Sequence, residues 1–386
     1  MSRFAVSLNA MSSDLLEQQT QTRIVSGPGS LGQLGALSVE LGGSRILLVS
    51  DRGVVSAGHA QFALDSIQAA GLSVDLYDGV EENPTAAHVR QGTQKAREFK
   101  PDLLVGLGGG SAMDCAKGIN FVYSCGGDIS DFQGIGKATS ELLPMIAVPT
   151  TSGTGSETQS FALISDDQSH QKMACGDKRA AFKVAVLDPL TTLTQPRHVT
   201  AATGIDAISH AVESYVTLER TPLSMDYSRE AWRLLSLNFP KVFSNPEDIE
   251  ARSGMQEGAS LAGLAIESSM LGAAHSAANP LTAEYGIVHG VAIGLVLPAV
   301  VRFNSQKVGA EYDKLTGTEG THGEGLAASL EEFRGLCGLP QALSDCKVRT
   351  EDIEKLSDDA AGQWTARFNP VKVSPADFQA IYKSAF

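Results

Sequence analysis

The chain has 386 residues, a length that favours two domains over one. Apolar residues make up 42% and charged residues 19%, which fits a globular protein and excludes a disordered one. The formal net charge of −14, without any block of lysine and arginine, argues against nucleic acid and against an anionic membrane surface as partners. The expected partners are therefore small molecules and further copies of the chain.

Neither the cysteines nor the N-terminal segment indicates export. The five cysteines are scattered and form no C-x-x-C pair, which predicts free thiols in a cytoplasmic protein. Residues 1–23 carry acidic side chains early and lack a continuous apolar stretch, so no signal peptide is expected. The longest apolar stretch, 290–301, contains Pro298 and is too short to cross a bilayer. The sequence therefore predicts a soluble protein without a membrane span.

From about residue 22 to residue 190, short apolar runs alternate with segments of helical periodicity. The runs are rich in β-branched residues and are followed by Gly, Asp or Pro, as expected of buried strands. Strands are predicted at 45–50, 73–77, 103–107, 145–148 and 184–187, with helices at 57–70 and 86–99. This alternation predicts βαβ units and a mostly parallel, Rossmann-like sheet with helices on both faces.

After Asp188-Pro189 the strand signal disappears and helical periodicity takes over. Helices are predicted at 199–217, 224–239, 251–265 and 283–303, in a region dense in glycine and alanine, whereas 309–325 is expected to be a loop or a frayed helix. The predicted boundaries are 1–195 for an α/β dinucleotide-binding domain and 196–386 for an all-helical domain.

A glycine-rich loop follows the strand predicted at 103–107. Gly108, Gly109 and Gly110 allow a close backbone approach, and Ser111 stands at the start of the next helix. Free N–H groups at a helix start attract anions, so a diphosphate is the expected ligand. The alternative is a plain tight turn in which Ser111 caps the helix.

A second loop, PTTSGTGSE, follows the strand predicted at 145–148. Its hydroxyls, among them those of Thr150, Thr151 and Thr154, can orient a phosphate or a ribose. Because both loops follow parallel strands, they are expected at the carboxyl edge of the sheet, where α/β folds bind nucleotides. Asp51 ends an earlier strand, where a carboxylate accepts the ribose hydroxyls and disfavours NADP relative to NAD. From position alone, Asp51 is equally compatible with a helix cap.

A metal site is predicted in the second half. Asp206 and His210 lie four residues apart in GIDAISHAVESYV, which places both side chains on one helix face. His275 and His289 follow on either side of Pro280 and are expected on successive helices. One carboxylate and three imidazoles favour Fe²⁺ or Zn²⁺ over Mg²⁺ or Ca²⁺. Each histidine alone fits a hydrogen-bonded core residue equally well, but a buried Asp206 without a partner would be costly, which favours the metal.

These motifs resemble those of the iron-containing, or group III, alcohol dehydrogenase family. The resemblance runs from about Ile24 to Phe386 and rests on GPG at 27–29, NPT at 83–85, GLGGGSAMDCAK, PTTSGTGSE, DPLTTLTQP, GIDAISHAVESYV, AAHSAANPLTAEYGIVHG and FNP at 368–370. It implies a dehydroquinate synthase-like architecture with an N-terminal nucleotide-binding domain and a C-terminal metal-binding and catalytic domain. It also implies a homodimer or a larger homo-oligomer.

The resemblance assigns roles to individual positions. By motif, the family's metal ligands fall on Asp206, His210, His275 and His289, and its cofactor contacts fall on Asp51, Gly108, Gly109, Gly110, Ser111, Asp114, Thr150, Thr151, Thr154 and Lys172. By analogy with the family's pocket, Phe161, Ile266 and Asn279 are expected to shape the substrate space.

The chain departs from the family pattern at Asn279. The family commonly has a histidine there, one turn after the third ligand and implicated in proton relay. An amide cannot shuttle a proton near neutral pH. Two interpretations stay open: a different proton route, or a role for Asn279 in pocket size and hydrogen bonding only.

The predicted activity is the interconversion of a small alcohol and its aldehyde or ketone. A divalent metal, Fe²⁺ first and Zn²⁺ second, would polarise the substrate oxygen, and NAD rather than NADP would exchange the hydride. Alternatives of the same architecture are glycerol dehydrogenase, maleylacetate reductase and a dehydroquinate synthase-like cyclase. A nucleotide-binding protein with a structural metal is a different class, which the absence of cysteine from the ligand set disfavours.

Overall fold

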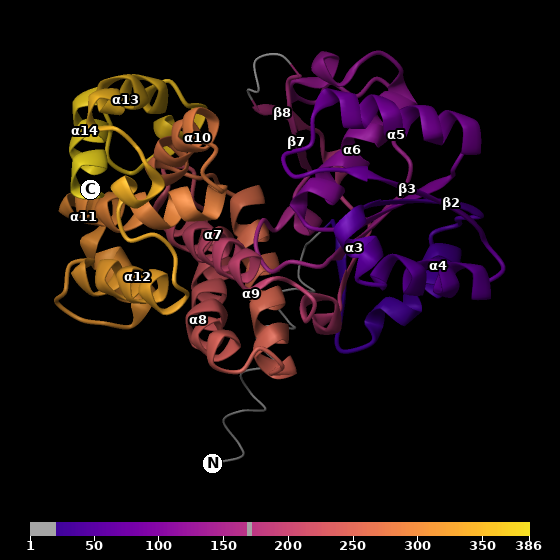
Figure 1. Cartoon of the computed structure of the whole chain (residues 1–386), viewed down its shortest axis with the longest axis horizontal. Helices are drawn as coiled ribbons and strands as arrows, with labels where there is room; N and C mark the ends of the chain where they lie inside the picture. The colour runs from indigo at the N-terminus through magenta and orange to yellow at the C-terminus, as the bar shows by residue number, and fades with distance from the viewer. Residues whose placement is uncertain (1–20, 168–171) are drawn as a thin grey trace. The chain divides into compact units, whose positions relative to one another are not determined.

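The structure, a computed structural model, describes residues 21–167 and 172–386 and consists of two compact units (Figure 1). Unit 1 comprises the chain up to Thr151 together with Gly155–Gln195, and unit 2 comprises Ser152–Thr154 and Pro196–Phe386. The signal-peptide expectation rests on an N-terminal segment that lies, except for its last residues, outside the described residues.

Unit 1 is built on a six-stranded sheet in the order β1-β9-β6-β4-β2-β3, in which every pair is parallel. Its strands are β1 (Arg23–Ser26), β2 (Arg45–Asp51), β3 (Ser73–Val80), β4 (Leu103–Gly108), β6 (Met145–Pro149) and β9 (Val184–Leu187). The prediction of a mostly parallel sheet is confirmed, and all five predicted strands are present. β1, an edge strand of four residues, was not predicted.

Alternation along the strands explains why both faces of this sheet are covered. Leu47 and Val49 of β2 pack into one apolar cluster, whereas Ile46 and Leu48 pack into another. The α-helices of the described part of this unit are α2 (Leu34–Glu40), α3 (Arg52–Ser56), α4 (His59–Ala69), α5 (Ala86–Phe99) and α6 (Gly110–Cys125). Every residue of the central strand β4 is buried, as expected of a strand enclosed on both sides.

Unit 1 also contains a small sheet that the sequence did not predict. Its order is β5-β8-β7, from β5 (Gly134–Ile135), β8 (Lys172–Gly176) and β7 (Phe161–Ser165), and β7 runs antiparallel to β8. β5 has two residues, too few to give any periodic signal.

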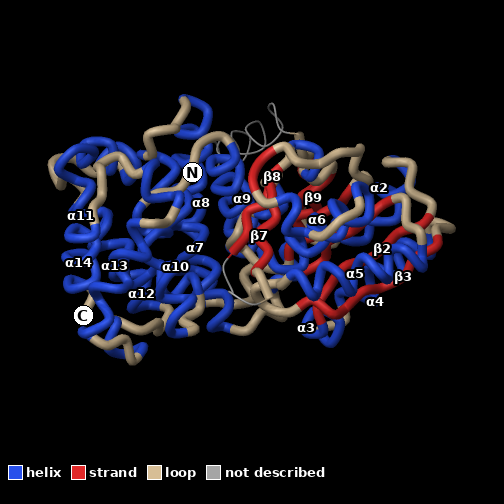
Figure 2. Tube along the Cα trace, turned by 90° about the horizontal axis from the view of Figure 1, so that it is seen from above, coloured by secondary structure: helices blue, strands red, loops and turns tan. Residues whose placement is uncertain are grey.

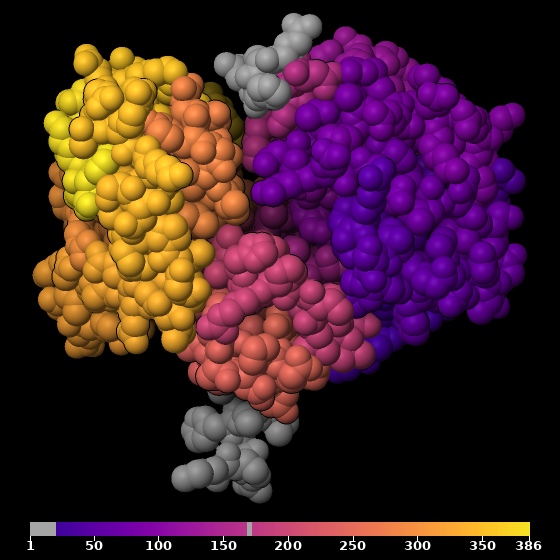
Figure 3. Space-filling view, viewed as in Figure 1, coloured from indigo at the N-terminus to yellow at the C-terminus, as the bar shows by residue number. Residues whose placement is uncertain are grey.

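Within the described residues unit 2 is helical, and Figure 2 shows no strand there. Its helices are α7 (Arg197–Val216), α8 (Pro222–Ser244), α9 (Ile249–Glu267), α10 (Ala273–Tyr285), α11 (His289–Thr316), α12 (Glu324–Leu336), α13 (Ile353–Ala361) and α14 (Pro375–Ser384). The last two helices, coloured yellow, form part of the surface of this unit (Figure 3). No described helix combines the length and the apolar character that a membrane crossing needs.

Two predicted helix boundaries are wrong. The helix predicted at 283–303 is interrupted, because α10 ends at Tyr285 and Gly286 adopts a left-handed φ of 65° before α11 begins. Pro280 lies inside α10, so the break between the helices that carry His275 and His289 comes six residues later than expected. In the segment predicted as a loop or a frayed helix, α11 continues to Thr316 beyond non-helical backbone at Val308.

Candidate metal centre

Three helices of unit 2 bring the predicted metal ligands together. Asp206 and His210 lie one turn apart on α7, His275 lies in the first turn of α10, and His289 is the first residue of α11. Asp206, His210 and His275 are each at most 6% exposed. Helices α10 and α11 are separate, as the sequence analysis expected for His275 and His289.

The three imidazoles surround one carboxylate oxygen. The Oδ1 atom of Asp206 lies 3.4 Å from Nε2 of His210, 3.7 Å from Nε2 of His275 and 3.8 Å from Nε2 of His289. Ligand atoms at about 2.0–2.1 Å from a tetrahedral ion lie about 3.4 Å from one another. The observed separations are therefore those of atoms that share one ion, and they exceed ordinary hydrogen-bond lengths.

Buried polar atoms at this cluster lack hydrogen-bond partners. Asp206 Oδ1 and His275 Nε2 are buried, and neither has a hydrogen bond within the described part of the chain. Leaving such atoms unpaired costs about 1–3 kcal/mol each. A divalent cation would satisfy both, so the residues present fit a metal. The ligand atoms of Asp206, His210 and His275 all lie within 4.8 Å of one another.

The electrostatics of the cluster also favour a cation. Burial raises the pKa of the Asp206 carboxyl, but the neighbouring histidines lower it by a larger amount, so the pKa lies below its usual value. Burial alone would lower the pKa of His275, yet the adjacent carboxylates of Asp206 and Glu213 raise it to about 9. Burial lowers the pKa of His210. The site thus combines a carboxylate with a field that stabilises positive charge at His275.

Glu213 belongs to this cluster, although the sequence analysis did not identify it. Its Oε2 lies 2.5 Å from Nδ1 of His275, and its Oε1 accepts a hydrogen bond from the N–H of Ala274 at 2.8 Å. A sequence signal was available: Glu213 follows Asp206 by seven residues and His210 by three, which places all three on one face of α7. A third polar side chain on that face could have indicated a further residue of the site.

In unit 1 the predicted nucleotide loops meet at the carboxyl edge of the sheet. Gly108 of β4 pairs with Pro149 of β6, and the N–H of Thr150 donates to the Gly108 carbonyl at 2.9 Å. Gly108 has a φ of +149°, and a Cβ there would lie 2.8 Å from Ala112 Cβ and 3.2 Å from Asp51 Oδ2. Glycine is therefore required at Gly108 for both conformation and space.

The two loops also contact each other. A Cβ on Gly109 would lie 3.4 Å from Cγ2 of Thr151. Beyond Thr151, the segment Ser152–Thr154 belongs to unit 2, where Gly153 packs against Thr203 of α7. The structure therefore brings Asp51, Gly108 and the first residues of PTTSGTGSE together, whereas Thr154 lies in the segment assigned to unit 2.

The sequence also allowed Ser111 and Asp51 to be simple helix caps, and the structure shows this role for only one of them. Gly109, not Ser111, is the N-cap of α6, so the capping alternative for Ser111 is wrong. Asp51 does cap α3, because its Oδ1 accepts a hydrogen bond from the N–H of Val54 at 3.0 Å. Its Oδ2 is the oxygen that faces Gly108. Capping therefore uses only one of the two oxygens of this carboxylate.

Asp114 lies behind the loops in a buried network. Its Oδ1 accepts a hydrogen bond from Ser156 Oγ at 2.5 Å, and its Oδ2 accepts one from the N–H of Leu163 at 3.2 Å. Lys117, which is fully buried, donates from Nζ to the Ser156 carbonyl, to Ser156 Oγ and to the Phe161 carbonyl, each at 2.8 Å. Burial raises the pKa of Asp114, an effect that Lys117 opposes.

The remaining predicted site residues are placed on separate elements. Phe161 begins β7, where its ring covers Gly176, and Lys172 is the exposed first residue of β8. Ile266 lies half-buried near the end of α9. Asn279 lies one turn after His275 on α10 and donates to Oε1 of Gln363 at 3.1 Å. Their parts in cofactor or substrate binding stay predictions.

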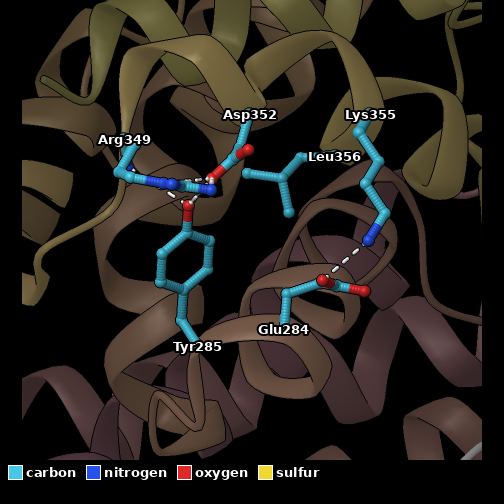
Figure 4. A pocket seen from close by; sticks show the side chains of 6 residues that line it. All are labelled: Glu284, Tyr285, Arg349, Asp352, Lys355 and Leu356. Atoms are coloured by element: carbon cyan, nitrogen blue, oxygen red, sulfur yellow. Dashed lines mark hydrogen bonds and ion pairs between the residues drawn. The ribbon is translucent and has the colours of Figure 1, made fainter.

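A separate pocket of about 240 Å³ lies between the end of α10 and α13 (Figure 4). Lys355 Nζ lies 2.7 Å from Glu284 Oε2, and Arg349 Nε donates to Asp352 Oδ2 at 2.8 Å. Tyr285 also donates to Asp352. Both cations that line the pocket are thus paired with adjacent carboxylates, and no histidine or cysteine lines it. The Lys355–Glu284 ion pair links α13 to α10, and the lining of the pocket gives no indication of a second metal site.

Comparison with known proteins identifies the family. The sequence model described as iron-containing alcohol dehydrogenase matches residues 21–189, and the one for the C-terminal part of the Fe-containing alcohol dehydrogenase family matches residues 200–386. The chain belongs to the iron-containing alcohol dehydrogenase family, as the sequence resemblance predicted.

Individual relatives agree with this assignment along nearly the whole chain. The chain is 32% identical over 370 residues to the NAD-dependent methanol dehydrogenase of Bacillus methanolicus, covering 94% of this chain and 97% of that protein. It resembles the crystal structure of a 1,3-propanediol oxidoreductase with a TM-score of 0.90 at 32% identity, covering 94% and 97%. It also resembles the sulfoacetaldehyde reductase of Bifidobacterium kashiwanohense in complex with NAD⁺, with a TM-score of 0.86 at 26% identity, covering 95% and 97%.

Proposed function

We propose that this chain is a metal-dependent alcohol dehydrogenase that interconverts a small alcohol and its aldehyde or ketone with NAD. The observation that carries the proposal is the arrangement of three imidazoles at 3.4 to 3.8 Å around one buried carboxylate oxygen. Family membership supplies the reaction class, and the dehydrogenase names of the relatives support the same reaction.

Four residues would hold the metal: Asp206, His210, His275 and His289. We propose Fe²⁺ as the native ion, in line with the description of the family, and Zn²⁺ as the other ion that this ligand set suits. When bound, the metal supplies a Lewis acid for the substrate oxygen, and NAD supplies or accepts the hydride. The protein contributes position, because three helices fix the ligands.

The carboxyl edge of the sheet in unit 1 would hold the nucleotide. The N–H groups at the start of α6 (Gly110, Ser111), together with Gly108 and Gly109, would bind the diphosphate. The hydroxyls of Thr150, Thr151 and Thr154 and the cation of Lys172 would supply further contacts. Asp51 Oδ2 would accept the ribose hydroxyls and favour NAD over NADP. We propose that Asp114 acts indirectly, through Ser156 of the second loop.

The substrate is proposed to be a small alcohol or aldehyde. The named relatives act on methanol, 1,3-propanediol and sulfoacetaldehyde, all compact molecules. Phe161, Ile266 and Asn279 would shape the substrate space. The hydrogen bond from Asn279 to Gln363 supports a role in pocket shape, because it fixes the orientation of the amide.

We also propose a cytoplasmic homodimer. The five cysteines are free thiols, which supports a reducing compartment. The homodimer rests on the family resemblance. Size-exclusion chromatography with light scattering would decide the oligomeric state, and a mass equal to that of a single chain would contradict a dimer.

A spectrophotometric screen tests the function. The protein is loaded with Fe²⁺ or Zn²⁺, and absorbance at the NADH band is followed with methanol, ethanol, 1,3-propanediol, glycerol and their aldehydes. We expect metal-dependent turnover of at least one pair and none in a His275→Ala variant. NADH that binds but is oxidised by no carbonyl compound would support the nucleotide-binding alternative instead.

A further inference from the structure

Helix α10 starts without a capping side chain of its own. Its N-cap is Gly272, which has no side chain to accept a hydrogen bond, and His275 lies only three residues later. The first N–H groups of a helix have no partner inside the helix, so other groups must satisfy them. In this chain two side chains distant in sequence do so.

Glu213 and Asn369 take the place of the missing cap. The N–H of Ala273 donates to Asn369 Oδ1 at 3.2 Å, and the N–H of Ala274 donates to Glu213 Oε1 at 2.8 Å. A Cβ on Gly272 would lie 2.9 Å from Asn369 Oδ1 and 3.0 Å from Glu213 Oε1. Glycine at the N-cap therefore makes room for both acceptors.

Asn369, from the FNP motif, is itself held by a reciprocal amide pair. Asn304 of α11 donates to Asn369 Oδ1 at 3.0 Å, and Asn369 Nδ2 donates back to Asn304 Oδ1 at 2.7 Å. Asn369 Nδ2 also donates to the carbonyl of Val371 at 2.7 Å. Both amides are buried, so this end of α10 is connected to α11, the helix that begins at His289.

Glu213 has a second role, because its other oxygen contacts the ring of His275. A carboxylate can only accept a hydrogen bond, so the Nδ1 atom of His275, 2.5 Å from Oε2, must carry the proton. In the neutral ring that can ligate a metal, the lone pair of His275 is then on Nε2, the atom that faces Asp206 Oδ1. One carboxylate thus fixes both the start of the helix and the tautomer of the ring.

We propose that Glu213 is a positioning residue for the metal, which orients His275 through its Nδ1 atom, while Asn369 braces only the start of α10. This inference rests on the proposed metal site. Hydrogen-bond partners of metal-ligating histidines fix the ring and typically change metal affinity by about 10- to 100-fold. Loss of Glu213 is therefore expected to weaken metal binding, and loss of Asn369 to affect mainly the stability of the fold.

The test is a Zn²⁺ titration against a competing chelator, on the full-length wild type and three variants. Glu213→Gln keeps the size of the side chain, but its amide has a single acceptor oxygen, whereas two hydrogen-bond donors face this side chain in the wild type. Asn369→Ala removes the brace without touching His275. Glu230→Gln is the matched control, because Glu230 is a buried carboxylate of the same unit that pairs with Arg233 at 2.6 Å, on α8.

We expect a Zn²⁺ dissociation constant raised by about 10- to 100-fold in Glu213→Gln, and values near that of the wild type in Glu230→Gln and Asn369→Ala. Thermal unfolding of the metal-free proteins separates loss of fold from loss of site, and we expect Asn369→Ala to lower Tm. Visible spectra of the Co²⁺ forms report the ligand geometry, and we expect a change only in Glu213→Gln.

Two failures are distinguishable. If the wild type binds no Zn²⁺, the proposed metal site itself is wrong. If the wild type binds one Zn²⁺ and Glu213→Gln binds it within about twofold of the wild-type affinity with an unchanged Co²⁺ spectrum, only the positioning role is overturned.

Discussion

Lys117 Nζ lies 2.8 Å from both the hydroxyl and the carbonyl oxygen of Ser156, so a fully buried ammonium group holds one end of the loop PTTSGTGSE. The same ammonium lies 5.2 Å from the ring centroid of Phe182. A buried lysine is tolerated only when its charge is compensated, and here three oxygens and the carboxylate of Asp114, 3.6 Å away, provide that compensation.

Replacing Lys117 with methionine should weaken both the fold and cofactor binding. The Ser156 and Phe161 carbonyls would lose a buried donor, at about 1–3 kcal/mol for each unsatisfied group. We expect a lower Tm and a raised KM for NAD, with a smaller effect on the KM for the alcohol. Lys183→Met, a change at an exposed lysine of the same unit, serves as the control. A Lys117→Met protein with the KM for NAD of the wild type would contradict the proposed role of the loop.

Gly290 allows helices α7 and α11 to approach closely beside His289. A Cβ on Gly290 would lie 1.9 Å from the carbonyl oxygen of Ala202, a backbone atom that cannot swing aside. Gly290→Ala should therefore push the two helices apart, lower Tm and reduce metal occupancy. Gly335→Ala, in α12 with no atom within 4 Å of its Cβ, should raise Tm slightly instead, because alanine favours helix by up to about 1 kcal/mol. Equal Tm changes in the two variants would contradict the packing argument.

The carboxylate of Asp51 should set the preference for NAD. Asp51→Ser keeps an acceptor for the N–H of Val54, and so preserves the cap of α3, but it removes the charge that repels a 2′-phosphate. We expect the ratio of kcat/KM for NADP to kcat/KM for NAD to rise, with little change in Tm. A wild-type enzyme that already prefers NADP would show that Asp51 does not have this role.

Some of this site is visible in the sequence and some is not. Asp206 and His210 are four residues apart, so a local rule places them on one helix face. Glu213 and His275 are 62 residues apart, and only the tertiary fold, in which α7 and α10 both pack against α11, brings them together. Burial is also not visible in the sequence, because no local sequence pattern distinguishes Lys117 from an exposed lysine. The break at Gly286 was missed because the apolar periodicity continues across it.

The hydrogen bonds that the Asp313 carboxylate accepts predict that one loop of unit 2 is sensitive to acid. Its carboxylate accepts hydrogen bonds from Thr321 Oγ1 at 2.6 Å and from the N–H groups of Thr321, His322 and Gly323 at 3.1 Å each. The side-chain hydrogen bond from Thr321 and these N–H groups lower the pKa of Asp313 to about 2.

Because the folded-state pKa lies below the value of about 3.9 for an unfolded aspartate, the stabilisation is present above about pH 4. It is lost as the pH falls through about 2. The Tm difference between the wild type and Asp313→Asn should therefore be constant from pH 5 to 7 and shrink below pH 4. A difference that stayed the same down to pH 2 would contradict this account.

The central claim, one divalent metal held by Asp206 and three histidines, is tested most directly by elemental analysis of His275→Ala. Purified wild type and variant are incubated with Zn²⁺, freed of unbound ions and measured for bound metal per chain, with thermal scans to verify folding. His198→Ala, a change at an exposed histidine in the first turn of α7, controls for loss of an imidazole. We predict one ion per chain in the wild type and in His198→Ala, and almost none in a folded His275→Ala protein. Full metal occupancy in that variant would contradict the claim.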